Sequence, residues 1–213
     1  MQQPIKGGSH MQRSVLFLAI GCSVIASLAL VAIMSTSSTR AEEPAKVELK
    51  LDPGTAVVLK KEVNGMPANT KLISTPSFVD YTLDPVVDGI KKRKELGWQE
   101  CSWASEENGL PHGIEIQFGM PQRGGRFQVT WAYDIYNADG GKWWISRDYV
   151  IQVKEKAADE WKTVFTVKNN QSVVGCYPLP NESIGFLRIY QLPGGGHPER
   201  PDIMWVGQVE LLD

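Results

Sequence analysis

The chain has 213 residues, of which 42% are hydrophobic and 22% charged, which is ordinary for a globular protein. All acidic residues follow Ala41, so residues 42–213 carry 19 basic and 24 acidic side chains, a net charge of −5. This balance argues against nucleic acid as the main partner, because phosphate binding needs an excess of Lys and Arg.

Residues 1–41 have the features of a targeting segment. The stretch from Val15 to Met34 carries no charge, follows Arg13, and leads through small residues to Ala41. The small residues favour a cleaved secretory signal, and the length of the apolar run leaves an uncleaved membrane anchor as the alternative. We therefore expect an exported protein that is secreted, periplasmic or held at the cell surface.

Residues 42–70 are interpreted as a tether followed by leading strands. Apolar residues alternate between Lys46 and Lys60, with a break at Pro53-Gly54. Asn-Gly and Pro signals in residues 64–70 predict a loop.

Residues 71–213 read as a series of short strands. Apolar side chains alternate with polar ones in four segments, and glycine and proline clusters separate the segments. The alternating apolar residues are Ile114, Ile116 and Phe118; Phe127, Val129, Trp131 and Tyr133; Tyr149, Ile151 and Val153; and Leu187 and Ile189. With no long amphipathic helix pattern, this predicts an all-β sandwich or jelly-roll barrel.

The familiar catalytic motifs are absent from the sequence. There is no nucleophile elbow, no zinc-protease motif, no phosphate loop and no dinucleotide fingerprint. His112 and His197 are the only histidines after residue 41, and neither has an obvious nucleophile beside it in sequence. We therefore expect no catalysis, with a glycan-active enzyme using loop carboxylates as a less favoured alternative.

Several motifs in order resemble the discoidin family, the coagulation-factor type C and galactose-binding-like domains. They are Asp88-Gly89, Trp103-Ala104-Ser105, the run from Pro111 to Gly119, Trp161, the run from Phe186 to Ile189, and the run from Gln208 to Leu211. The resemblance implies an eight-stranded jelly-roll β-sandwich over residues 71–213, with ligand sites on loops at one end. Many bacterial relatives bind sugars, and some animal relatives bind phospholipid through protruding apolar side chains.

The resemblance also implies a structural calcium ion, for which Asp88 and Glu210 are the candidate ligands. The chain departs from the family pattern because Gln208 stands where an acidic residue is expected. The alternative is that Asp88 only supports a turn. A second departure is that no Arg follows the strand ending near Tyr133 until Arg147, which counts against a galactose-type pocket.

The best candidate ligand surface combines flat aromatic rings with hydrogen-bonding side chains. A sugar presents a C–H face that stacks on indole and hydroxyls that need paired donors and acceptors. The candidates are Tyr136, Asn137, Asp139, Trp143 and Trp144 in one loop, His197 and Arg200 in the loop before the last strand, and His112 and Trp98 as weaker additions. The core is expected to hold Trp103, Trp131, Trp161 and Trp205.

Two cysteines, Cys101 and Cys176, follow the targeting segment. In an exported protein they could form a disulfide or remain two thiols. The leading functional hypothesis is a carbohydrate-binding module with a glycan or glycoconjugate as partner. The alternative is a membrane-surface or protein-adhesion module, in which adjacent tryptophans contact a bilayer interface.

Overall fold

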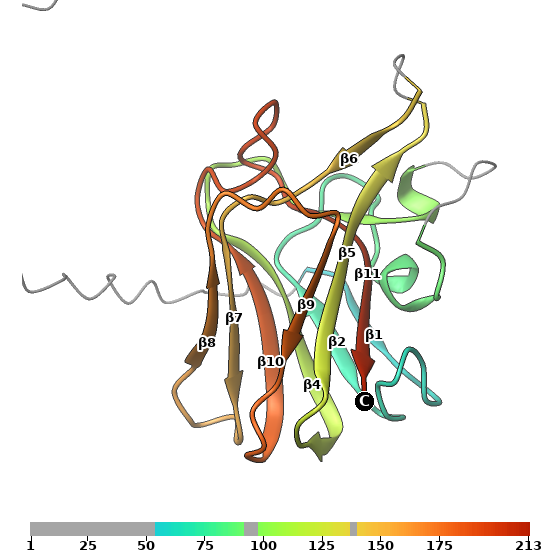
Figure 1. Cartoon of the computed structure of the whole chain (residues 1–213). Coiled ribbons are helices and arrows are strands. Elements are labelled where there is room, and N and C mark those ends of the chain that lie inside the picture. Colours follow the sequence, from blue (N-terminus) through green and yellow to red (C-terminus); the bar gives the residue numbers. More distant parts are fainter. Residues whose placement is uncertain (1–53, 92–97, 137–139) are drawn as a thin grey trace, which may run out of the picture. The chain divides into compact units, whose positions relative to one another are not determined.

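The computed structural model describes residues 54–91, 98–136 and 140–213, which form a sandwich of two antiparallel sheets (Figure 1). The strands are β1 (Ala56–Val58), β2 (Lys71–Ser74), β3 (Trp103–Ala104), β4 (His112–Gln122), β5 (Arg126–Asp134), β6 (Lys142–Trp144), β7 (Tyr149–Lys154), β8 (Lys162–Val167), β9 (Val174–Pro178), β10 (Ile184–Gln191) and β11 (Trp205–Leu212). The predicted all-β sandwich is confirmed, although these residues divide into eleven strands, several of them short, rather than eight.

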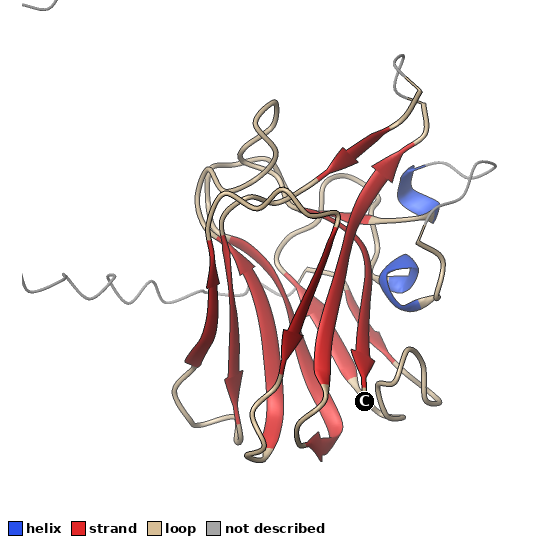
Figure 2. Ribbon diagram, viewed as in Figure 1, coloured by secondary structure: helices blue, strands red, loops and turns tan. Residues whose placement is uncertain are grey.

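One sheet has the order β1-β2-β4-β10-β7-β8, and the other has the order β3-β11-β5-β6, with β9 also paired to β5. The free side of β5 is shared, because β9 pairs with Arg126–Thr130 and β6 pairs with the later residues Ala132–Asp134. Two short 3-10 helices, η1 (Asp84–Val87) and η2 (Trp98–Glu100), lie beside the strands (Figure 2). No helix in the described ranges is both long and apolar enough to span a bilayer.

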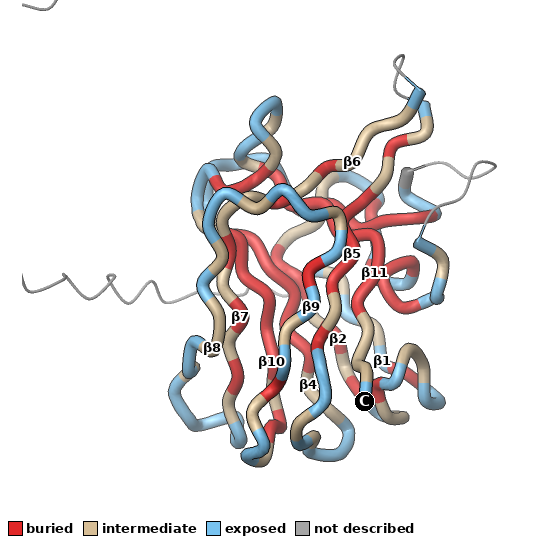
Figure 3. The backbone as a smooth tube through the Cα atoms, viewed as in Figure 1, coloured by how far each residue is buried: buried red, intermediate tan, exposed pale blue. Residues whose placement is uncertain are grey.

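The core lies between the sheets and contains the side chains that the alternation predicts. Ile114 and Ile116 of β4 and Phe127 and Val129 of β5 are completely buried. The rings of Trp131 and Tyr149 meet edge-on at 5.0 Å between centroids, and this contact joins β5 of one sheet to β7 of the other. Burying each such side chain contributes about 1.5–3 kcal/mol, which makes this alternation the main reason for the fold. Figure 3 shows the buried residues along the strands and the exposed ones at the turns.

Strand β1 belongs to the six-stranded sheet. Its residues pair with β2, with Ala56 opposite Ile73 and Val58 opposite Lys71. The leading strand expected in residues 42–70 is therefore an edge strand of the sandwich. The proposed signal or anchor segment, residues 1–41, lies outside the described residues.

One predicted core residue is placed differently. Trp103, Trp131 and Trp205 are buried, but Trp161 is only partly buried and lies on the outer face of the six-stranded sheet. It follows the β7–β8 turn and stacks against Arg188, whose guanidinium carbon is 4.3 Å from the ring centroid. The prediction was wrong because position in a family motif does not say which face of a sheet a turn residue covers.

The strand directions gather six connections at one end of the sandwich, here called the loop end (upper part of Figure 1). Strands β2, β5, β8 and β10 end there, and β4, β7, β9 and β11 begin there. The connections are residues 75–83, 105–111, 135–141, 145–148, 168–173 and 192–204, with residues 137–139 outside the described ranges.

Candidate ligand-binding site at the loop end

The β5–β6 hairpin projects from the loop end and sends adjacent tryptophans to opposite sides. Tyr133 pairs with Trp143 and Ala132 pairs with Trp144, so consecutive side chains point to alternate faces. Trp143 is half-buried against the Tyr133 ring at 4.8 Å, whereas Trp144 is 9% exposed and packs inward. At Gly141 φ is +106°, and an added Cβ would lie 2.0 Å from the Tyr133 hydroxyl, so this turn requires glycine.

Trp144 lies among polar and charged groups from two segments. Its ring meets His197 edge-on at 4.9 Å between centroids, and the Lys142 ammonium lies 4.6 Å from the ring centroid. Lys142 also forms an ion pair with Glu199. The backbone N–H of Glu199 donates to Nδ1 of His197 at 3.3 Å, which orients the imidazole. The hairpin and the β10–β11 connection thus share one cluster.

Hydrogen bonds join the neighbouring loops into one platform. The carbonyl of Gly195 accepts bonds from the backbone N–H groups of Arg147 at 2.7 Å and Asp148 at 3.0 Å. The N–H of Asn170 donates to the carbonyl of Arg147 at 2.9 Å, and the Arg147 guanidinium contacts the Asn169 side chain. Three connections, 145–148, 168–173 and 192–204, therefore hold the cluster in a fixed arrangement.

The local potential at His197 is positive. Partial burial lowers the pKa of His197 below its ordinary value, and the charges of Lys142 and Arg147 lower it further, while Glu199 opposes them. The imidazole is therefore neutral at pH 7, with one ring nitrogen able to donate and the other to accept. A neutral imidazole beside an ammonium and a guanidinium offers several donors to hydroxyl or carbonyl oxygens.

Arg200 links two loops rather than pointing into free solvent. Its Nε and Nη2 donate to the two carboxylate oxygens of Glu107 at 3.0 and 2.5 Å, a bidentate pair. The guanidinium also lies 5.6 Å from the ring centroids of Phe78 and Trp205. This arrangement ties connection 105–111 to connection 192–204.

Among the predicted ligand residues, the structure brings Trp144 and His197 into contact and places Trp143 on the other face of the same hairpin. Tyr136 follows the end of β5 and is 60% exposed. Asn137 and Asp139 lie outside the described residues, as does the side chain of Trp98, whose backbone begins η2.

His112 does not reach the surface. It is 2% exposed at the start of β4, and its Nε2 bonds to the carbonyl of Asp202 at 3.0 Å. This corrects the expectation that His112 contributes to ligand binding. The sequence pattern placed it near the loop end but could not show that β4 begins below the surface.

Three charged residues of the cluster, Lys142, Arg147 and Glu199, were not predicted as ligand residues. From the sequence, Arg147 is too distant from Tyr133 to match the family pattern, and Lys142 and Arg147 are candidates only for contact with anionic lipid head groups in the membrane-surface alternative. The hydrogen bonds from connection 145–148 to Gly195 bring its charge close enough to lower the pKa of His197. The sequence signal was the concentration of charge around the two tryptophans.

The candidate calcium ligands have other partners. The Asp88 carboxylate accepts a bond from the backbone N–H of Ile90 at 2.7 Å, as in an Asx turn. Glu210 accepts from Lys91 at 2.7 Å and from Gln128 at 2.6 Å. No cluster of three or more His, Cys, Asp or Glu side chains suited to a metal occurs in the described part of the chain. These residues do not supply the six to eight oxygens that calcium requires, and an ammonium already neutralises Glu210.

Cys101 and Cys176 are not joined by a disulfide. Cys101 is buried just after η2, whereas Cys176 is exposed on β9. The sequence left open either a disulfide or two thiols, and the structure has two separate thiols.

No protein-family model and no curated protein matches this sequence. Solved structures do. Chitosan-binding module 1 of a chitosanase/glucanase from Paenibacillus sp. IK-5 aligns with a TM-score of 0.51 and 16% identity, over 73% of this chain and 97% of the module. Module 2 of the same enzyme, in complex with chitotriose, aligns with a TM-score of 0.50 and 17% identity, over 73% and 98%.

A family 32 carbohydrate-binding module of a GH31 protein, bound to GalNAc, aligns with a TM-score of 0.52 and 14% identity, over 68% of this chain and 97% of the module. The shared fold is the galactose-binding-like, or discoidin-like, β-sandwich. At these identities the likeness establishes the fold alone, so what the chain binds has to be argued from its own residues.

Proposed function

We propose that this chain is an exported, non-catalytic carbohydrate-binding module that binds a glycan at the loop end. The observation that carries the proposal is the cluster of Trp144, His197, Lys142, Glu199 and Arg147, assembled from connections that are bonded to one another. It combines an aromatic base with donors and acceptors, the combination that a sugar ring requires. The sugar-binding modules named above share the fold, which supports this choice of ligand class.

The same geometry narrows the sugar class. Two cations, Lys142 and Arg147, lie near His197 against one anion, Glu199, and this excess of positive charge disfavours sugars that carry an ammonium group. We therefore propose neutral or N-acetylated sugars as ligands. In this arrangement Trp144 forms the base of the site, and the exposed Tyr136, which follows β5, provides a further stacking surface. Trp143 lies on the other face of the hairpin.

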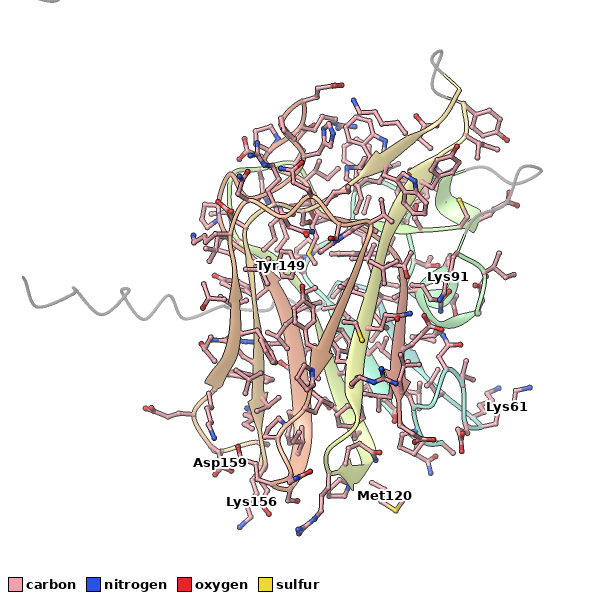
Figure 4. The ribbon with its side chains drawn as sticks, in the orientation of Figure 1. Lys61, Lys91, Met120, Tyr149, Lys156 and Asp159 are labelled. Atoms are coloured by element: carbon pink, nitrogen blue, oxygen red, sulfur yellow. The ribbon has the colours of Figure 1, made fainter. Side chains whose placement is uncertain are left out.

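Binding of a glycan panel to the full chain, followed by calorimetric titration of the best ligand, tests the proposal. The panel contains galactose, GalNAc, and chitin oligomers in N-acetylated and deacetylated forms. Arg147→Ala removes a charge from the site and is expected to weaken binding about five- to tenfold. Lys156→Ala is the matched control, because Lys156 lies at the end opposite the loop end (Figure 4) and is exposed.

Absence of binding to every glycan would refute the proposed function. Equal loss of affinity in the Arg147→Ala and Lys156→Ala variants would refute the proposed site. Better binding of the deacetylated oligomers than of the acetylated ones would contradict the inferred sugar class.

Membrane-surface binding is the second candidate, and exposed apolar side chains favour it. Val79, Leu110 and Tyr136 are 72%, 60% and 60% exposed, and all three lie in connections at the loop end. Such side chains can enter a bilayer interface. The net charge of −5 after residue 41 opposes attraction to anionic lipid. Flotation with neutral and with anionic vesicles measures membrane binding directly. The Leu110→Ser variant separates the two functions, because it is expected to lose vesicle binding and to keep glycan binding.

A further inference from the structure

The outer face of the six-stranded sheet carries a second group of polar and aromatic side chains, on a strand surface rather than on the loops. Alternation along β10 directs Phe186, Arg188 and Tyr190 outward. Arg188 pairs in register with Glu115 of β4 on one side and Gln152 of β7 on the other. Arg188 is only 8% exposed, although it lies at the centre of an outer sheet face.

Neighbouring side chains hold the Arg188 guanidinium in one position. Its Nε donates to Oε1 of Gln152 at 2.6 Å, and its carbon lies 4.3 Å from the ring centroid of Trp161 and 5.6 Å from that of Tyr190. The Lys154 ammonium lies 4.7 Å from the centroid of the same Trp161 ring. Because the indole already contacts both Lys154 and Arg188, we assign it the role of holding Arg188 in place.

No carboxylate among the described residues forms an ion pair with Arg188, although Glu115 is its neighbour on β4. Burial lowers the pKa of Arg188, and Glu115 only partly offsets this. No ion pair joins the two side chains, and the Glu115 carboxylate instead accepts a hydrogen bond from Gln117 at 3.0 Å. No described residue accepts a hydrogen bond from either Nη group of Arg188. Two parallel guanidinium donors are therefore left for an acceptor.

A second donor at this place also lacks a partner. Tyr190 is 5% exposed, and its hydroxyl is buried with no hydrogen-bond partner. Leaving such a hydroxyl unsatisfied is unfavourable, and a ligand oxygen or a bridging water would satisfy it. The unpaired donors of Arg188 and Tyr190 stand within one side-chain cluster.

The net charge of this face is opposite in sign to that of residues 42–213 as a whole. Alternation puts Lys71, Lys154 and Arg188 on it against Glu115 alone, a net charge of +2, whereas residues 42–213 carry −5. Because β10 is paired on both sides, a peptide could not bind here by adding a strand. A ligand therefore has to bind to the side chains of this face. The side-chain amides of Gln117 and Gln152, the Tyr190 hydroxyl and the Phe186 ring are groups that suit a sugar.

We propose that this sheet face is a second binding site, distinct from the loop end, which takes the carboxylate of an acidic sugar on the Arg188 guanidinium. The planar carboxylate matches the two Nη donors in a bidentate pair, Tyr190 donates to the same group directly or through water, and Gln117 and Gln152 lie beside it for sugar hydroxyls. Trp161 is a positioning residue. The proposal does not depend on the loop-end function.

Titration of the full chain with galacturonate oligomers and with the same oligomers as methyl esters tests this site, since esterification removes only the charge. The acid is expected to bind about tenfold or more tightly than the ester. Arg188→Gln is expected to abolish this difference. Arg123→Gln, which removes an exposed arginine from the β4–β5 turn, and Arg147→Ala at the loop end are expected to retain it.

Equal binding of acid and ester, or an unchanged preference in Arg188→Gln, would overturn the proposal. If Arg188→Gln does not fold, Arg188→Lys replaces it in the test, because lysine keeps the charge but lacks the two parallel donors. Full affinity of the Arg188→Lys variant for the acid would also overturn the proposal. Binding of dextran sulfate without binding of galacturonate would overturn the assignment to carboxylates. If the proposed loop-end function is wrong, the chain will fail to bind neutral sugars but will still prefer the galacturonate oligomers to their methyl esters.

Discussion

The rings of Trp144 and His197 meet edge-on with centroids 4.9 Å apart, and they come from segments more than fifty residues apart in sequence. This contact joins β6 to the β10–β11 connection. Trp144 also lies 6.0 Å from Trp205, so the indole extends from the core to the proposed site. The indole at the base of the site is therefore anchored to the sandwich itself.

Stability should fall as the pH is lowered below neutral. Burial lowers the pKa of His112 below its ordinary value of 6.5, although its bond to the Asp202 carbonyl partly offsets this. Above 6.5 His112 is neutral in both states, but below it the unfolded chain takes up the proton first, so folding is penalised. We expect the melting temperature to fall between pH 7 and 5, and less steeply in His112→Gln. Equal slopes in the two proteins would contradict this assignment.

Ser77→Ala should destabilise the fold by about 1–3 kcal/mol, because it leaves a buried donor unsatisfied. The indole N–H of Trp103, which is fully buried, donates to the Ser77 hydroxyl at 2.8 Å. Denaturant unfolding measures the change, and Thr82→Ala, at an exposed position of the same segment, is the control. A loss no larger than that of the control would show that water satisfies the indole.

The bidentate pair between Arg200 and Glu107 should contribute little to stability. Their side chains are 32% and 38% exposed, and exposed pairs of this kind contribute about 0.2–1 kcal/mol. A double-mutant cycle with Arg200→Ala and Glu107→Ala is expected to give a coupling in that range that shrinks as salt is added. A coupling that salt does not change would mean that the pair is shielded from solvent.

Native thiol labelling should modify Cys176 and spare Cys101. Cys176 is exposed on β9, whereas Cys101 is 8% exposed. Peptide mapping after alkylation, without and with denaturant, is expected to show Cys101 modified only in the denatured sample. Protection of both residues until a reductant is added would instead reveal a disulfide.

The sequence was sufficient to predict the sandwich, because alternation of apolar side chains directly encodes which face of a strand is buried. Ile114, Phe127, Trp131 and Ile151 all lie in the core as that pattern predicts. The pattern was less informative at strand ends and turns. Trp161, in a turn, and His112, at a strand start, were misplaced because their burial depends on where neighbouring strands stop.

The candidate site was predicted only in part for a related reason. Aromatic residues beside polar ones drew attention to Trp143, Trp144 and His197, but contacts between loops are set by the fold. Arg147 enters the site through the hydrogen bonds to Gly195, which no local pattern indicates. The same holds for Arg188, whose unpaired donors depend on pairings with two other strands.

The most direct test of the central claim follows the indole N–H signals of the seven tryptophans by NMR while the best neutral or N-acetylated glycan is added to the full chain. Binding at the loop end predicts that the signal of Trp144, assigned from a Trp144→Phe variant, shifts in a saturable manner while those of Trp103 and Trp131 stay in place. Saturable binding that leaves the Trp144 signal unshifted would contradict the account.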